Sequence, residues 1–304
     1  MIVVGGEALI DLVASGTGEL EAHPGGGPFN AARTIARLEQ RATFLGRLSN
    51  DRFGQRLRAE LEDSGVDMGA AVATDDPTTL ALAEVGEGGS ATYRFYTAGT
   101  SAPGLTVEDA RRALPERVTG MLVGTLGLVL EPMASTLEEV YASAAEETIR
   151  VLDPNCRPMV TTDPDGYRAR LTRMLAHTDL AKASEEDLEW LHPGPTVEAA
   201  RALLADGAGT VIVTRGGDGA TVVTADHEFD VPAPQVTVVD TIGAGDAFAG
   251  ALLAFWHERG YDRSRLNDAD ALREATEFAC LVAARNVERA GASPPRRSEL
   301  HPSQ

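Results

Sequence analysis

The stretch Asp240–Asp246 (DTIGAGD) runs directly into the apolar segment Ala247–Trp256. A turn with two glycines at the start of a helix directs several backbone N–H groups at one point, where an anion can bind. Asp246 stands at that point, and a carboxylate there can accept a proton while the amides of Gly243, Ala244 and Gly245 hold a phosphoryl group. The stretch indicates phosphoryl transfer to a hydroxyl. An ordinary glycine turn with an acidic first-turn residue stays open as the alternative.

A second glycine-rich segment, Pro24–Arg33 (PGGGPFNAAR), precedes another amphipathic helix near the opposite end of the chain. Its three glycines let a ligand approach the backbone closely, and Asn30 offers both a donor and an acceptor. This combination suits a ligand rich in hydroxyl groups. A flexible turn with Asn30 as a helix cap is the alternative that the segment alone leaves open.

Short β-branched runs alternate with amphipathic helical stretches along the 304 residues. This alternation predicts a three-layer, Rossmann-like α/β fold, with a mostly parallel sheet covered by helices on both faces. The length suffices for one such domain with an insertion, which is the expected organisation, or for two smaller domains. Strands are predicted at Val3–Val4, Thr43–Leu45, Met121–Leu126, Thr148–Leu152, Thr178–Leu180 and Val211–Thr214. Helices are predicted at Phe29–Glu39, Phe53–Ser64, Val107–Leu114, Met133–Glu147, Tyr167–His177, Ser184–Leu191, Val197–Leu204, Ala247–Glu258 and Asp268–Arg289.

Two regions, about 8–23 and 71–100, break this alternation and resemble inserted antiparallel β structure. The second contains the turn Gly86–Ser90 between alternating strands. A small β lid over a site and a plain edge hairpin are both consistent with this pattern. Exposed strand edges of a lid also make a homodimer through it an open prediction.

Charge and cysteine content limit the classes of partner. A net charge of −19 and a sequence pI near 4.7 argue against nucleic acid and against an anionic membrane as partners. The two cysteines, Cys156 and Cys280, have no metal-ligand spacing. The chain begins without a basic leader and has no apolar run that could span a bilayer, so a soluble, cytoplasmic protein is expected.

Of the 27 basic residues, 26 are arginine and one is lysine, Lys182. Its neighbours do not form a G-x-x-x-x-G-K-[ST] loop, which excludes a Walker-type phosphate site. The survival of one lysine among so many arginines is a mild indication that a compact ammonium group is needed there, and chance survival stays open.

Together, these features resemble the ribokinase-like, or phosphofructokinase B, family of carbohydrate kinases. The resemblance covers nearly the whole chain and rests on the two glycine-rich helix starts and on the order of the segments between them. These segments are Gly46–Gly54, in which a serine replaces one family glycine, Leu130–Pro132, Asp153–Pro158 and Thr214–Ala220. Each match is weak alone, and their ordered conjunction is specific.

The resemblance implies ATP and a small sugar as ligands, with a role for each matching residue. Asp246 is expected to take the proton of the sugar's primary hydroxyl, beside an anion hole of amides from Gly243 to Asp246. The expected sugar-binding residues are Asp11, Gly26, Gly27, Asn30, Glu131 and Arg157. The expected nucleotide-binding residues are Lys182, Thr214, Gly216, Gly217 and Gly219, with small residues of the last helix beside the adenine.

The family's pattern for Mg²⁺ falls on Ser184 and Asp187, both of which differ from the family type, and Asp187 is expected to keep an oxygen ligand for the ion. Asp240, with the carbonyl of Ile242, matches part of a monovalent-cation loop, which leaves K⁺ open as a further cofactor.

Fructokinase-type members are the best match, so a fructose-like neutral sugar is the expected acceptor. Thr97 aligns where kinases of acidic keto-deoxy sugars carry an arginine, and the loss of that cation favours a neutral sugar. Ribokinase, nucleoside kinase and 2-keto-3-deoxygluconate kinase activities are the alternatives. A sugar-binding regulator without turnover is the alternative from a different class.

Overall fold

The computed structural model describes residues 1–14, 20–85 and 91–300. Within these ranges the main sheet has nine strands, in the order β13-β12-β11-β10-β9-β8-β1-β4-β5. All pairings from β11 to β5 are parallel, and β12 and β13 add an antiparallel edge. The strands are β1 (Ile2–Gly5), β4 (Ala42–Ser49), β5 (Ala71–Thr74), β8 (Gly120–Gly124), β9 (Ile149–Asp153), β10 (Leu180–Ser184), β11 (Thr210–Thr214), β12 (Ala220–Val223) and β13 (Glu228–Val231). The prediction of a mostly parallel sheet is confirmed.

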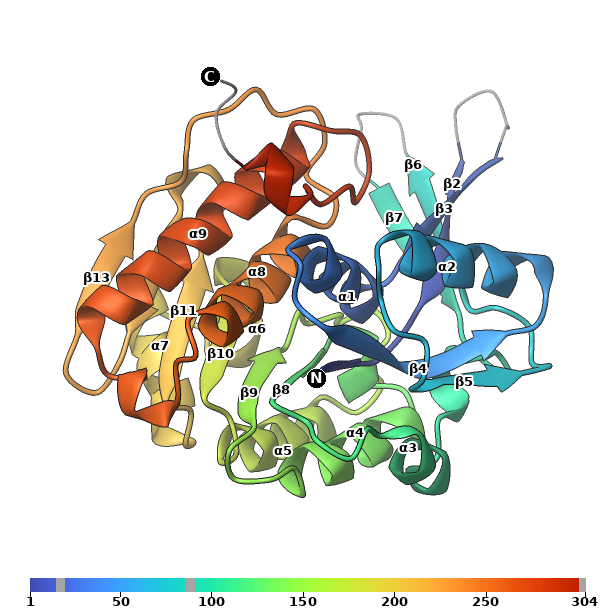
Figure 1. The fold of residues 1–304 in the computed structure, drawn as a ribbon, viewed down its shortest axis with the longest axis horizontal. Helices are drawn as coiled ribbons and strands as arrows, with labels where there is room; N and C mark the ends of the chain where they lie inside the picture. Colours follow the sequence, from blue (N-terminus) through green and yellow to red (C-terminus); the bar gives the residue numbers. More distant parts are fainter. Residues whose placement is uncertain (15–19, 86–90, 301–304) are drawn as a thin grey trace.

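Helices cover both faces of this sheet (Figure 1). One face carries α1 (Gly27–Arg37), α2 (Arg52–Asp63), α8 (Ala244–Glu258) and α9 (Ala269–Val287). The other carries α3 (Val107–Ala113), α4 (Met133–Ala142), α5 (Pro164–Leu175), α6 (Glu185–Leu191) and α7 (Thr196–Ala205). Each of the predicted helices is present, with ends that differ by a few residues.

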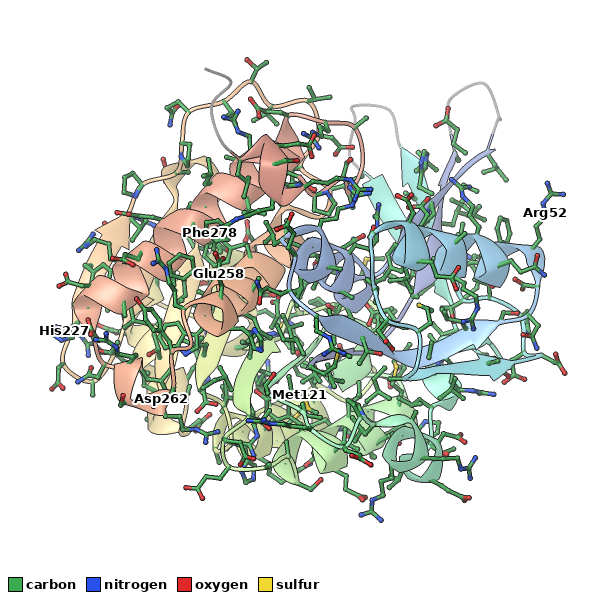
Figure 2. All side chains as sticks on the ribbon, viewed as in Figure 1. Arg52, Met121, His227, Glu258, Asp262 and Phe278 are labelled. Carbon is green, nitrogen blue, oxygen red and sulfur yellow. The ribbon has the colours of Figure 1, made fainter. Side chains whose placement is uncertain are left out.

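The central strands are apolar on both sides because each side is covered by a helical layer. Two clusters of buried side chains result, one under α1, α8 and α9 and the other under α4, α5 and α7. Met121 of β8 lies in the interior, whereas Arg52 at the start of α2 points away from the molecule (Figure 2). Trp256 of α8 is fully buried.

Local signals set several element ends. Ser184 and Asp187 form a capping box at the start of α6. Gly65, with φ of +89°, follows α2 in the left-handed conformation expected of a terminating glycine. The predicted strand at Thr178–Leu180 is shifted, since β10 runs from Leu180 to Ser184. Strands β12 and β13 were not predicted, because runs of four residues are too short to show a clear periodicity.

A second sheet contains β2 (Leu9–Ala14), β3 (Leu20–Gly25), β6 (Leu80–Val85) and β7 (Ala91–Tyr96), in the order β3-β2-β6-β7. The predicted antiparallel lid is present as two antiparallel pairs joined by parallel pairing of β2 with β6. The lid range was too wide, since residues 71–74 form β5, which pairs with β4 of the main sheet. The predicted turn at Gly86–Ser90 lies outside the described residues.

No helix in the described ranges is both long enough and apolar enough to cross a membrane.

Candidate active site

Two cavities meet at the start of α8. The larger, of about 510 Å³, lies beside the lid sheet, and the smaller, of about 300 Å³, lies between β11 and α9. Their linings share Thr241, Ala244 and Gly245. The larger cavity is lined by Glu7, Leu9, Asp11, Gly26, Gly27, Asn30, Phe95, Thr125, Leu126, Asn155, Arg157, Pro158, Met159, Ile242, Gly243 and Asp246. The two glycine-rich segments therefore share one cleft.

The loop Asp240–Gly245, called here the anion loop, forms the floor between the cavities. Gly243 has φ of +74° and precedes the first residue of α8. The first amides of a helix have no partner within the helix, so those of Gly243, Gly245 and Asp246 are suited to an anion. The amide of Ala244 differs, because it donates to the carbonyl of Thr241 at 3.2 Å.

Asp246 lies in the first turn of α8, in the wall of the larger cavity. Its Oδ2 accepts a hydrogen bond of 2.9 Å from the side-chain amide of Asn30 on α1. A Cβ added at Gly27 would lie 3.2 Å from Oδ1 of Asp246 and 2.3 Å from Oγ1 of Thr125. Glycine at position 27 therefore keeps the space between α1 and α8 open.

Asp11 of β2 lies in the wall of the same cavity. Burial and the charge of Asp246 raise its pKa to about 6. A Cβ added at Gly25 would lie 2.1 Å from Oδ2 of Asp11, so the strand paired with β2 needs a glycine there. The structure thus brings Asp11, Gly26, Gly27 and Asn30 together, as the sequence predicted.

Glu7 was not predicted as a site residue. It is fully buried at the edge of the cavity, and its carboxylate accepts hydrogen bonds from the amides of Gly27 at 3.1 Å and Gly127 at 3.2 Å. Burial raises the pKa of Glu7 to about 8, and the negative charge of Asp246 contributes. An acidic residue immediately after a buried strand and a glycine pair was the available signal.

Thr125 and Asn155 also line the cavity without having been predicted to. Both have positive φ, +56° and +38°, and Asn155 donates to Oγ1 of Thr125 at 3.2 Å. Strained residues of this kind gather at functional sites. Arg157 lies in the same wall, where its guanidinium donates to the carbonyls of Asn155 at 3.1 Å and Cys156 at 3.0 Å.

Lys182 of β10 lies beneath the anion loop. It is 3% exposed, and its Nζ contacts Asp153 of β9 at 3.1 Å. Burial alone would lower the pKa of Lys182, but the charges of Asp153, Asp187 and Asp246 outweigh it and raise the pKa above its ordinary value. A Cβ added at Gly245 would lie 2.9 Å from Nζ. The ammonium group is thus placed directly under the start of α8.

The smaller cavity contains the glycine turn after β11. Thr214, Gly216, Gly217 and Gly219 lie in its wall, as predicted for a nucleotide site. The opposite wall carries the small or apolar residues Phe248, Cys280, Ala283, Ala284 and Val287. The last helix therefore lines this cavity with small and apolar side chains, and its place beside an adenine stays a prediction.

Glu131 does not lie with the other predicted sugar-binding residues. Its carboxylate accepts from the amide of Ser135 at 3.1 Å and pairs with Arg170 of α5. It lines a separate depression that also contains Arg173. The prediction that Glu131 contacts the ligand is corrected, because its charge is used in joining α4 to α5.

Asp187 is placed as a cap instead of as a free metal ligand. Oδ1 accepts from the amide of Cys156 at 2.6 Å, and Oδ2 accepts from the amide of Ser184 at 2.8 Å. In the described residues no group of three or more histidine, cysteine, aspartate or glutamate side chains is arranged to hold a metal ion. The donors around Asp187 leave its carboxylate poorly suited to bind Mg²⁺ directly, which corrects that prediction.

The carboxylate of Asp240, at the start of the anion loop, accepts hydrogen bonds from two backbone amides. Its Oδ1 accepts from the amide of Ile242 at 3.0 Å, and its Oδ2 accepts from the amide of Gly291 at 2.8 Å. The carbonyl of Ile242 accepts from the side chain of Asn286 at 2.9 Å.

Similar proteins agree with this arrangement. Residues 1–299 match the model of the pfkB family carbohydrate kinases. A fructokinase of Rhizobium leguminosarum bv. trifolii is 36% identical over 259 residues, which cover 84% of this chain and 79% of the relative. Fructokinase-1 of Oryza sativa subsp. japonica is 32% identical and covers 99% of this chain and 95% of its own.

Solved structures give the same result. Fructokinase from Xylella fastidiosa with bound ATP has a TM-score of 0.91 at 27% identity, covering 98% of this chain and 96% of that one. Aminoimidazole riboside kinase from Salmonella enterica has a TM-score of 0.84 at 29% identity, covering 98% of each chain. A double-mutant fructokinase from Vibrio cholerae with fructose, ADP and potassium bound has a TM-score of 0.86 at 27% identity, covering 98% of this chain and 96% of that one. The chain belongs to the pfkB family of carbohydrate kinases.

Proposed function

We propose that this carbohydrate kinase transfers the γ-phosphoryl group of ATP to the primary hydroxyl of fructose. One observation carries the proposal: the two cavities meet at Thr241, Ala244 and Gly245, with Asp246 in the wall of the larger one. A sugar in the larger cavity and a nucleotide in the smaller one would face each other across the anion loop. Holding two reactants next to each other in this way contributes much of the rate acceleration in enzymatic phosphoryl transfer.

Asp246 is assigned as the base. It takes the proton of the primary hydroxyl as that oxygen forms a bond to the γ-phosphorus and the bond to the leaving ADP oxygen breaks. The hydrogen bond from Asn30 orients the carboxylate. The amides of Gly243, Gly245 and Asp246 stabilise the negative charge of the transferred group by donating hydrogen bonds to it. Lys182 lies beneath these amides as a buried cation.

The sugar hydroxyls are assigned to Asp11, Asn30 and Asn155, with close backbone approach at Gly26 and Gly27. Carboxylate and amide groups suit vicinal hydroxyls because they accept and donate over short distances. Thr97 stands where kinases of acidic keto-deoxy sugars carry an arginine, so the cation that would pair with a substrate carboxylate is missing there, and Arg157 is held by two hydrogen bonds from Nη1 to the carbonyls of Asn155 and Cys156. A neutral sugar therefore fits this cavity better than an acidic keto-deoxy sugar.

The smaller cavity is assigned to ATP, whose phosphates would follow the turn Gly216–Gly219 toward the anion loop. Magnesium enters the proposal with the nucleotide, since Mg²⁺ is commonly held by substrate phosphates and water and neutralises their charge. No residue of this chain is assigned as its ligand, because the carboxylate oxygens of Asp187 are occupied by backbone donors. A cytoplasmic location and a homodimer through the lid stay predictions.

The test is ADP release by the purified chain with fructose, ribose, adenosine and 2-keto-3-deoxygluconate as acceptors. We expect the highest kcat/KM with fructose. Preference for adenosine or ribose would favour the second candidate, which the similarity to an aminoimidazole riboside kinase supports. Tight sugar binding without ADP release from any acceptor would show a non-catalytic regulator and overturn the proposal.

A further inference from the structure

The anion loop is fixed to the end of α9 and the residues after it, a segment called here the C-terminal brace (residues 286–292). The brace matters because Asp240 and Ile242 resemble part of the family's monovalent-cation loop, and the similar fructokinase from Vibrio cholerae was solved with potassium bound. The residues of this chain that match part of such a site are Asp240 and the carbonyl of Ile242. Whether they fit a cation can be tested on their hydrogen bonds.

A potassium ion needs several oxygen atoms directed at one point. In this chain the carbonyl of Ile242 accepts a hydrogen bond of 2.9 Å from Nδ2 of Asn286, so a donor and not a further oxygen ligand lies against it. Asn286 is fully buried, so bulk water does not compete for this hydrogen bond. Both oxygens of Asp240 also accept from backbone amides, one of them the amide of Gly291 in the brace. These groups fit a closed hydrogen-bonded loop better than a cation site.

The orientation of the Asn286 amide follows from the same contact. Turning it over would place Oδ1 against the carbonyl oxygen of Ile242, and two oxygen atoms at that distance repel each other. In the observed orientation Oδ1 is buried without a hydrogen-bond partner in the described structure, while Nδ2 donates to the carbonyl of Ile242. The hydrogen bond to Ile242 is therefore the dominant interaction of the amide.

The guanidinium group of Arg33 also binds the brace. Arg33 of α1 is 6% exposed, and its Nη1 donates to the carbonyl of Ala292 at 3.0 Å. Its charge is balanced by Glu60 at 3.2 Å. A Cβ added at Gly243 would lie 2.6 Å from the Cβ of Ala292, so the brace packs directly against the anion loop. The same helix carries Asn30, which orients Asp246.

We propose that Asn286 and Arg33 hold the anion loop in its working shape in place of a bound potassium ion, so that turnover does not require a monovalent cation. The inference rests on the proposed kinase function. Asn286 and Arg33 are positioning residues, since neither lines the sugar cavity or the nucleotide cavity.

The first test compares turnover of the purified chain, with ATP and fructose, in KCl and in tetramethylammonium chloride at equal ionic strength. We expect the wild-type rates to agree within about twofold. Asn286→Asp puts a carboxylate oxygen against the Ile242 carbonyl, which creates a cation ligand. We expect this variant to lose about tenfold or more in turnover in tetramethylammonium chloride and to regain it in KCl. Asn267→Ala is the matched control, because it removes an exposed side-chain amide that lies outside the brace and outside both cavities.

The second readout is the midpoint of thermal unfolding in the same two salts, which needs no turnover. We expect no difference for the wild type and a higher midpoint in KCl for Asn286→Asp, because a bound ion stabilises the folded state. A wild-type rate and midpoint that both rise strongly in KCl would overturn the inference, even if Asn286→Asp fails to fold. Absence of turnover with every acceptor would instead refute the proposed function, and the unfolding midpoints would still decide the cation question.

Discussion

The side-chain amide of Asn30 donates a hydrogen bond of 2.9 Å to the carboxylate of Asp246, although the two residues are 216 positions apart. The contact joins α1 to α8, which pack side by side over the same face of the main sheet (Figure 1). It places a residue of the sugar cavity in direct contact with the proposed base. Positioning of the hydroxyl and activation of the hydroxyl are therefore coupled through one hydrogen bond.

Replacing Asp246 by asparagine should lower turnover by about two to four orders of magnitude, the usual contribution of a general base. The variant keeps the size of the side chain and one oxygen that can accept from Asn30, so folding and ATP binding should be nearly unchanged. Turnover is measured by ADP release, ATP binding by calorimetry and folding by thermal unfolding. Turnover close to that of the wild type would show that Asp246 is not the base.

Gly245→Ala should reduce turnover by about tenfold or more, because small misplacements at a reaction centre are costly. The added Cβ would lie 2.9 Å from Nζ of Lys182, which must then move away from its place under the anion loop. Folding should be retained, since the end of a lysine side chain can shift. Gly69→Ala is the control, because its added Cβ would likewise lie 2.9 Å from the end of a side chain, Oδ1 of Asp67, and Gly69 lines neither cavity. Equal kinetics for the two variants would contradict the proposed role of Lys182.

Lowering the pH should reduce kcat/KM for fructose, because Asp11 becomes protonated. Its pKa is raised from 3.8 to about 6 by burial and by Asp246, so the carboxylate becomes protonated as the pH falls through 6. Below that point kcat/KM for fructose should fall by about tenfold for each pH unit, because a protonated carboxyl accepts hydrogen bonds poorly. Asp11→Asn should have a low kcat/KM without this dependence. A profile that is the same in wild type and variant would assign the titration to another group.

Glu7 should make the protein less stable as the pH rises. Its pKa is 4.5 in the unfolded chain and about 8 in the folded one, so between these values only the folded state holds the proton. Raising the pH through this window therefore favours unfolding, by at most about 1.4 kcal/mol per pH unit, and the effect levels off above pH 8.

Glu7→Gln should remove this part of the pH dependence, because glutamine does not ionise. The free energy of unfolding, measured with urea across the window, should therefore fall less with pH in the variant than in the wild type. Parallel curves for the two proteins would show that Glu7 is ionised in the folded state throughout.

Glu131→Gln should leave the KM for fructose within about twofold of the wild-type value, in contrast to Asp11→Asn. Glu131 lies outside the sugar cavity and pairs with Arg170. Since its side chain is half exposed, loss of the pair should cost at most about 1 kcal/mol of stability. A large increase in KM with unchanged stability would return Glu131 to the sugar site.

The sequence predicted the helices well because their boundaries are marked by local chemistry. Asp51 caps α2 and the Ser184–Asp187 box opens α6, and both signals lie within four residues of the element they start. Strands β12 and β13 were missed because each has only four residues, and so short a run shows no clear local pattern. The place of β5 in the main sheet was also missed, since pairing with β4 is a long-range contact.

The residues of the candidate site also divide into those that the sequence predicted and those that it did not. The glycine-rich turns and Asp246 were recognisable because a turn at a helix start has a sequence pattern of its own. Glu131 was assigned to the sugar through a short motif, yet the approach of α5 gives its carboxylate Arg170 as a partner. Glu7, Thr125 and Asn155 gained a place in the cavity only through the packing of separate strand ends.

The sequence by itself determined the helices, their alternation with strands, the two glycine-bearing helix starts and the family, because these depend on residues that are neighbours along the chain. Only the tertiary structure decided which carboxylates line the larger cavity, which are used as caps or ion pairs, and that Asn286 and Arg33 donate to the carbonyls of Ile242 and Ala292. The physical reason is that burial and hydrogen-bond partners arise where distant segments pack together, and no local pattern specifies them.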